Sequence, residues 1–180
     1  LQALAGDWEV SDGVALLEAL AAIGDPRARV SVHRILVSAS DPRVERAALV
    51  ALEALGAGPG ADDIERRLTS SDAGLARQAL GTLLQVDPER GARALTAAVA
   101  ASDPAQVQQA AELALAWRHP LVAPVLFGLV NEGTRAERAL SALSELDGGA
   151  GVPVLLHVAR ESAQHAGSAR LGLAMALRRW

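Results

Sequence analysis

The sequence predicts an all-α protein, and within that class an α-solenoid: a superhelix of antiparallel helix pairs that recur about every 30 residues. Three observations support this prediction. They are the amino-acid composition, one amphipathic helix with clear start and stop signals, and the recurrence of that helix along the chain.

The composition favours helices over strands. Of the 180 residues, 51% are hydrophobic, but there is one Phe, there are three Trp and there is no Tyr. The apolar content is therefore almost entirely Ala, Leu and Val. Such residues suit closely packed helices, whereas a β-sandwich needs aromatic and β-branched strands.

Residues 41–56, DPRVERAALVALEALG, have the pattern of one complete helix. Asp41 is a suitable N-cap, Pro42 suits the first helical position, and Gly56 can adopt the left-handed turn that ends a helix. Apolar residues between these signals follow helical spacing and form one stripe, so the helix buries one face. The stripe consists of Val44, Ala47, Ala48, Ala51, Leu52 and Leu55.

The same helix recurs along the chain. Similar starts stand at Asp12, Asp41, Asp72, Asp103, Glu132 and Ser162, separated by 29, 31, 31, 29 and 30 residues. An alanine follows seven residues after each start, and a small side chain there lets neighbouring helices approach closely. These alanines are Ala19, Ala48, Ala79, Ala110, Ala139 and Ala169.

A second, shorter helix is predicted in the remaining half of each repeat. Because a unit of this size cannot bury both helices alone, neighbouring units must stack. The first helix of each repeat is called helix A here and the second helix B. Helix B is expected in residues 25–37, 59–70, 87–100, 119–130 and 151–160.

The segments DPRVERAALVALEALG (41–56) and HPLVAPVLFGLV (119–130) resemble the HEAT repeat, in the short bacterial form found in phycobilin-lyase-like proteins. The resemblance covers roughly residues 12–177. It implies a right-handed solenoid whose B helices line the concave face.

We expect residues 1–180 to form a single HEAT-like repeat domain. Residues 1–11 resemble the tail of a preceding repeat, and the chain starts with Leu1, so we expect a fragment of a longer protein. Flanking sequence or a second copy in a homo-oligomer would cap its ends. No membrane-spanning run or signal segment is apparent, and we expect a cytoplasmic location. The repeats lie near 12–40, 41–71, 72–102, 103–131, 132–161 and 162–180.

The sequence carries no recognisable catalytic, cofactor or metal motif. Cysteine is absent, so thiolate chemistry is excluded. HEAT-repeat hydroxylases that bind a di-iron centre carry His-Glu pairs, but none of the four histidines precedes a glutamate, and His119 is expected to cap a turn. Phosphate-loop, nucleophile-elbow and dinucleotide-binding motifs are also missing. We therefore expect no catalytic residues, no cofactor, no metal and no enzymatic activity. The histidines are His33, His119, His157 and His165.

The sequence most favours a non-enzymatic scaffolding function, in which the chain binds another protein along its B helices. Such an extended surface lets one partner contact several repeats. The expected contact residues are basic in the first three repeats and mainly apolar in the fourth and fifth. They are Arg34, Arg66, Arg67, Arg93, Val125, Val154 and His157.

Two alternatives remain open at this point. One is DNA binding of the alkylpurine-glycosylase type, but the net charge of −4 and the acidic Asp62, Asp63 and Glu65 argue against a continuous basic track. The other is a phycobilin lyase-like subunit, which is suggested by repeat length alone.

Overall fold

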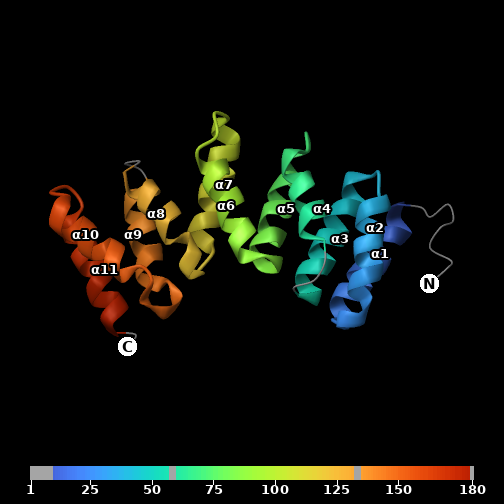
Figure 1. Cartoon of the computed structure of the whole chain (residues 1–180), viewed down its shortest axis with the longest axis horizontal. Coiled ribbons are helices and arrows are strands. Elements are labelled where there is room, and N and C mark those ends of the chain that lie inside the picture. Colours follow the sequence, from blue (N-terminus) through green and yellow to red (C-terminus); the bar gives the residue numbers. More distant parts are fainter. Residues whose placement is uncertain (1–9, 57–59, 132–134, 179–180) are drawn as a thin grey trace. The chain divides into compact units, whose positions relative to one another are not determined.

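The structure is a computed structural model and describes residues 10–56, 60–131 and 135–178 (Figure 1). Within these ranges the chain forms helices and no strand, which confirms the all-α prediction. None of the helices in these ranges is both long and apolar enough to cross a membrane. In chain order they are α1 (Val10–Ile23), η2 (Pro26–Ala28), α2 (Arg29–Ser38), α3 (Pro42–Leu55), α4 (Ala61–Arg66), η3 (Arg67–Thr69), α5 (Ala73–Val86), α6 (Pro88–Val99), α7 (Pro104–Ala116), η4 (Pro120–Val122), α8 (Ala123–Val130), α9 (Ala136–Glu145), η5 (Asp147–Gly149), α10 (Val152–Glu161) and α11 (Ala166–Arg178).

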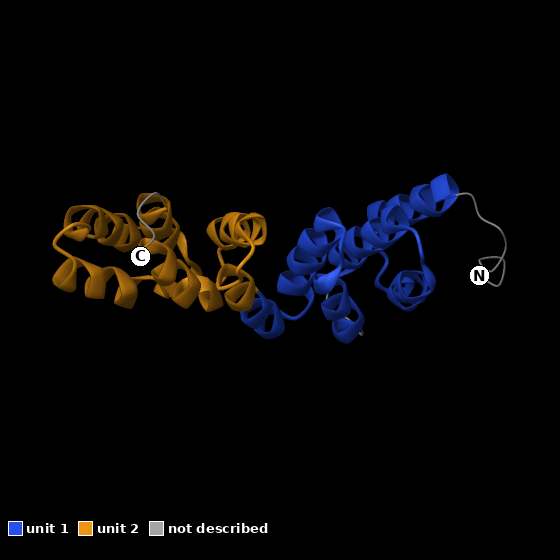
Figure 2. Ribbon diagram, turned by 90° about the horizontal axis from the view of Figure 1, so that it is seen from above, with its two compact units in different colours: residues 1–94 blue, residues 95–180 orange. Residues whose placement is uncertain are grey.

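Odd-numbered α-helices are the predicted A helices, and even-numbered α-helices are the B helices. The chain forms two compact units, residues 1–94 and 95–180, and the boundary falls within α6 (Figure 2). In the first unit α1, α3 and α5 pack side by side, and in the second unit α7, α9 and α11 do so. Helix α2 contacts α3 and α4 contacts α5, as α8 contacts α9 and α10 contacts α11. This stacking of helix pairs confirms the α-solenoid prediction.

Three of the predicted helix starts are N-caps in the structure. The carboxylates of Asp41, Asp72 and Asp103 accept hydrogen bonds of 2.8, 2.9 and 3.0 Å from backbone N–H groups two or three residues later. The predicted start at Ser162 caps a turn, because its hydroxyl oxygen accepts the backbone N–H of His165 at 3.2 Å ahead of α11. The expected start at Glu132 lies outside the described residues, as do residues 1–9 of the expected preceding tail.

The predicted register is wrong in the first repeat. Asp12 lies inside α1 and does not start it, because the helix already includes Val10. Ala19, seven residues after Asp12, is exposed, and Ile23 is 72% exposed, while Leu17 is fully buried. In the other five repeats the predicted alanine is at most 1% exposed, which confirms its packing role. These residues are Ala48, Ala79, Ala110, Ala139 and Ala169.

Two glycines allow helices A and B of one repeat to approach closely. A Cβ atom at Gly91 of α6 would lie 2.6 Å from the Cα atom of Leu84 in α5, too close for any side chain. A Cβ atom at Gly151, just before α10, would collide with the backbone carbonyl of Leu143 in α9. Each unit has its own apolar core, with Leu36, Leu49 and Leu83 among the fully buried side chains of the first and Leu126, Leu140 and Leu155 among those of the second.

Candidate interaction surface

The seven predicted contact residues divide between the two units. The first unit contains Arg34 on α2, Arg66 on α4, Arg67 at the start of η3 and Arg93 on α6. The second unit contains Val125 on α8 and both Val154 and His157 on α10.

Helix α2 exposes a strip that combines apolar and basic side chains. Val30, Arg34 and Val37 follow each other at intervals of four and three residues, so they share one face of the helix. Val30 is 59% exposed and Val37 is 51% exposed, and Arg34 is exposed between them. We call these three residues the α2 strip. On α6, Arg93 is exposed as well.

Arg67 has an internal role that the sequence did not reveal. Its side chain is only 13% exposed. The guanidinium donates to the Glu45 carboxylate at 2.9 Å and to the carbonyl of Asp63 at 2.7 Å. It also donates to the carbonyl of Leu36. Arg67 therefore joins α2, α3 and α4, and each of its three side-chain nitrogen atoms donates a hydrogen bond within the fold.

Acidic and basic side chains alternate on the surface around α4. Arg66, whose side chain is 69% exposed, pairs with Asp63, and the same carboxylate lies 2.7 Å from Nε2 of His33. Asp62 pairs with Arg90 of α6, and this hydrogen-bonded guanidinium lowers the pKa of the Asp62 carboxyl. In the described part of the first unit, these pairs interrupt the predicted row of arginines with compensating negative charge.

In the second unit, Val125 is buried and does not lie on the surface as the sequence predicted. This residue is 6% exposed and belongs to the core, so its assignment to the binding surface is wrong. Helix α8 is apolar on nearly every side, and its periodicity could not indicate which side faces the neighbouring helices.

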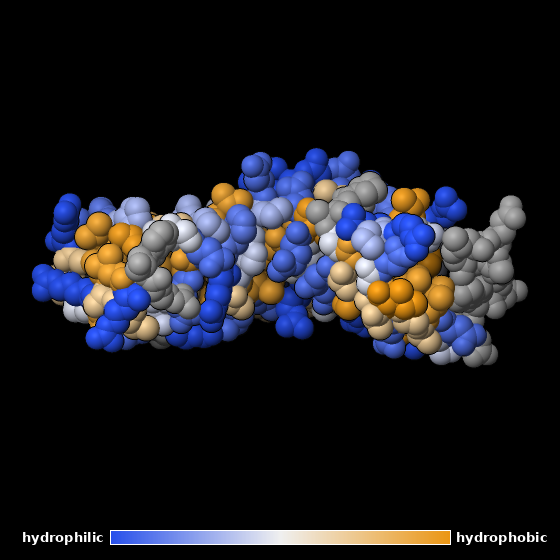
Figure 3. All heavy atoms as spheres, turned by 90° about the horizontal axis from the view of Figure 1, so that it is seen from below, coloured by the Kyte–Doolittle hydropathy of each residue, from blue (hydrophilic) through white to orange (hydrophobic). Residues whose placement is uncertain are grey.

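On α10 the expected surface residues are accessible to different degrees. Val154 is half-buried, whereas His157 is exposed and meets the ring of Phe127 edge-on, with 5.5 Å between ring centroids. Leu156 beside it is 40% exposed. On the face of each unit that Figure 3 shows, apolar patches lie between hydrophilic side chains.

His119 caps a turn, as predicted. Its Nδ1 atom accepts the backbone N–H of Leu121 at 3.3 Å, and its ring stacks on Trp117 with 4.8 Å between centroids. Nowhere in the described ranges do three His, Cys, Asp or Glu side chains gather in a way that could hold a metal ion.

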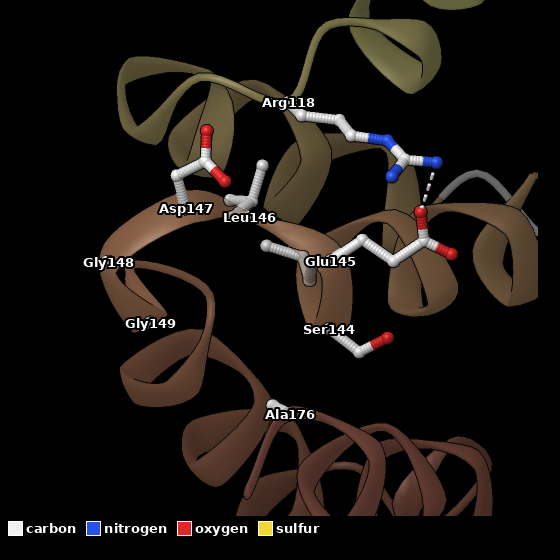
Figure 4. A pocket seen from close by; sticks show the side chains of 9 residues that line it. Arg118, Ser144, Glu145, Leu146, Asp147, Gly148, Gly149 and Ala176 are labelled. Carbon is white, nitrogen blue, oxygen red and sulfur yellow. Dashed lines mark ion pairs between the residues drawn. The ribbon is translucent and has the colours of Figure 1, made fainter. Parts of the chain in front are cut away.

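The second unit also contains a pocket of about 310 Å³ that sequence reasoning missed (Figure 4). We call it the Asp147 pocket. It lies where the connection from α7 to η4, the end of α9 with η5, and the end of α11 come together. It is lined by Arg118, Leu143, Ser144, Glu145, Leu146, Asp147, Gly148, Gly149 and Ala176.

Two local features shape the Asp147 pocket. Gly148 and Gly149 have φ values of 65° and 69°, a backbone conformation that strongly favours glycine, and they turn the chain sharply after α9. Among the lining residues, Arg118 and Glu145 form an ion pair of 2.7 Å (Figure 4). The Asp-Gly-Gly sequence signals the turn, but the sequence does not indicate that Arg118 and Ala176 complete a pocket around it.

No protein-family model matches the sequence, and no curated protein matches it. The solved structures that resemble this chain include the following two. One is an engineered protein, 18% identical over 92% of this chain and 90% of that chain, with a TM-score of 0.47. The other is human deoxyhypusine hydroxylase in complex with glycerol, 15% identical over 96% of this chain and 81% of that chain, with a TM-score of 0.38.

The second similarity corrects one expectation. From the sequence we expected a chain without enzymatic activity, and this expectation is withdrawn, since one of these two structures is that of a hydroxylase. At this TM-score the similarity transfers neither that activity nor any residue to the present chain.

Proposed function

We propose that this chain is a protein-binding repeat module whose B helices hold a partner protein. The observation that supports the proposal is the α2 strip, where Arg34 is exposed between two exposed valines. Interface cores combine apolar contact with arginine more often than the rest of a protein surface does. Arg93 extends the same chemistry to α6.

The charge pattern favours a protein over a nucleic acid as the partner. A phosphate backbone requires an excess of positive charge along the contact. Around α4, Asp62 and Asp63 already neutralise Arg90 and Arg66, and the whole chain has a formal charge of −4. A protein partner with both signs of charge complements such a surface.

The second unit supplies a more neutral part of the proposed surface. Exposed His157 and Leu156 on α10 adjoin the half-buried Phe127 and Val154. Together these side chains suit an apolar segment of a partner protein that also carries one hydrogen-bonding group.

We further infer that the repeats belong to the short bacterial kind of HEAT repeat, which the spacing of about 30 residues supports.

A capture experiment with matched charge reversals tests the proposed function. The purified chain serves as bait in lysate, with and without nuclease, and retained proteins are identified and then purified for titration. Arg34→Glu and Arg93→Glu should each weaken binding by about tenfold, the loss for removing one interface contact of roughly 1.4 kcal/mol. The control is Arg77→Glu, which reverses an exposed charge on the A helix α5 of the same unit.

The possible results of this capture experiment have different consequences for the proposal. A defined protein that stays bound after nuclease treatment and discriminates Arg34→Glu from Arg77→Glu supports the proposal. Loss of all retained material after nuclease treatment contradicts it and favours nucleic acid. Equal affinities for all three variants would remove the B helices of the first unit from the binding surface.

A further inference from the structure

We propose that the Asp147 pocket receives an arginine side chain from the partner protein. This inference rests on the proposed protein-binding function and assigns a ligand chemistry to one place on the second unit. It follows from the size of the pocket, its apolar floor and the charge that is left uncompensated at its rim.

The size and floor of the pocket fit one long side chain. A volume of about 310 Å³ lies at the small end of the range for ligand pockets. Leu143, Leu146 and Ala176 supply an apolar floor, and each is at most 6% exposed. The methylene stem of an arginine can lie on such a floor while its charged end remains at the opening.

Among the described residues that line the pocket, negative charges outnumber positive charges by one. The guanidinium of Arg118 is engaged by Glu145 at 2.7 Å, so these two charges compensate each other. The exposed carboxylate of Asp147 forms no ion pair with another described residue, although its backbone N–H donates to the Arg118 carbonyl at 3.4 Å. A cation is therefore favoured over an anion at this rim.

Among the side chains that line the pocket, Asp147 and Ser144 can accept hydrogen bonds. The Ser144 hydroxyl already donates to the Ser141 carbonyl at 2.6 Å, which leaves its oxygen lone pairs available, and Asp147 offers carboxylate oxygens. A guanidinium has five N–H donors and no acceptor, in a planar arrangement that matches carboxylates. An arginine side chain therefore matches the charge of Asp147 and the apolar floor together.

A spectroscopic titration tests the pocket without the natural partner. The ¹⁵N-labelled full chain is titrated with a capped Gly-Arg-Gly peptide, and the amide shifts of Glu145, Gly148 and Gly149 are followed. The matched probe carries citrulline, which has almost the same shape as arginine but no charge. We expect saturable shifts at these amides with the arginine peptide and at least threefold weaker binding of the citrulline peptide, as for loss of an exposed ion pair of roughly 0.7 kcal/mol.

Two variants assign the effect to Asp147. Asp147→Asn keeps the shape of the side chain and should weaken the arginine peptide by about threefold, whereas Asp147→Lys should abolish the shifts. Asp12→Asn, an exposed aspartate on α1 of the first unit, should leave the affinity unchanged. Equal affinity for the arginine and citrulline peptides, or for Asp147→Asn and the unmodified chain, would overturn the proposal.

Agmatine, a free alkylguanidine, distinguishes a polypeptide ligand from a small molecule. Tighter binding of the peptide than of agmatine supports a polypeptide source, and the reverse order contradicts it.

The capture experiment can fail independently of this titration. A partner that binds normally to Asp147→Asn would overturn the pocket assignment and leave the protein-binding function intact.

Discussion

At the scale of single residues, two adjacent arginines that look alike in the sequence have different surroundings. The Arg66 side chain is 69% exposed and pairs with one carboxylate, whereas that of Arg67 is 13% exposed and donates to acceptors on three helices. Successive side chains of a helix point in directions about 100° apart, so the two adjacent guanidinium groups meet different surroundings. Because its side chain is exposed, Arg66 can still be reached by a partner protein, whereas the mostly buried Arg67 cannot.

Replacing each of these arginines by methionine should separate the two roles. Arg67→Met leaves two backbone carbonyls and the carboxylate of Glu45 without this donor, and should lower the free energy of unfolding by about 2–3 kcal/mol. Arg66→Met should change it by less than about 0.5 kcal/mol. Urea denaturation followed by circular dichroism measures both, and equal midpoints would show that the contacts of Arg67 do not stabilise the fold.

At the scale of the helical element, one small residue fixes how closely the A helices pack. The alanine seven residues after each predicted start is buried in five repeats, where neighbouring helices leave no room for a larger side chain. In the first repeat the corresponding Ala19 is exposed on α1. The structure therefore provides a buried and an exposed version of the same sequence position.

Leucine at these positions tests the corrected register. Ala139→Leu should overpack α9 and cost about 1–3 kcal/mol of unfolding free energy. Ala19→Leu places the same side chain on an exposed face of α1 and should change stability by less than about 0.5 kcal/mol. Thermal melting of both variants is the measurement. A costly Ala19→Leu would restore the register expected from the sequence, and a silent Ala139→Leu would refute tight packing at α9.

Helix existence and start signals were predictable from the sequence, but the direction of individual side chains was only partly so. Asp41 combines a cap, a following proline and an amphipathic stripe, and these local signals agree with each other. Val125 lies in a helix without a polar face, so its burial depends on neighbours that periodicity does not specify. The Asp147 pocket depends on Arg118, Gly148 and Ala176, which are distant in sequence and share no pattern.

At the scale of the whole molecule, polar contacts tie successive A helices together within each unit. In the first unit Arg46 of α3 pairs with the N-cap Asp72 of α5 at 3.3 Å. In the second, Arg138 of α9 pairs with Glu112 of α7 at 2.7 Å, and Ser168 of α11 donates to Glu137 of α9 at 2.9 Å. Stability is therefore spread over many neighbouring contacts, as expected for a repeat protein.

Several surface ion pairs between an arginine and a carboxylate make stability depend on acid pH. A hydrogen bond from an arginine side chain is the main cause that lowers the carboxyl pKa in each of them. A carboxylate with a lowered folded-state pKa stabilises the fold above its unfolded pKa, and this contribution is lost as the pH falls through the folded value. The carboxylates are Asp25, Asp41, Asp62 and Glu112.

We therefore expect the melting temperature to fall as the pH is lowered from about 5 to about 2. Glu112→Gln should reduce the size of that fall, because glutamine cannot be protonated in this range. Glu161→Gln, at an exposed position at the end of α10, should not reduce it. Calorimetric scans across the pH series measure the effect, and a melting temperature that stays constant down to pH 2 would contradict it.

The polar contacts that join the helices also bear on how fast the chain can fold. These hydrogen bonds span short sequence intervals, from 22 residues between Glu45 and Arg67 to 33 between Leu49 and Thr82. A chain whose contacts are this local closes only short loops and loses little entropy before each contact forms. Folding can then begin at any adjacent helix pair and spread from it, as it does in other repeat proteins.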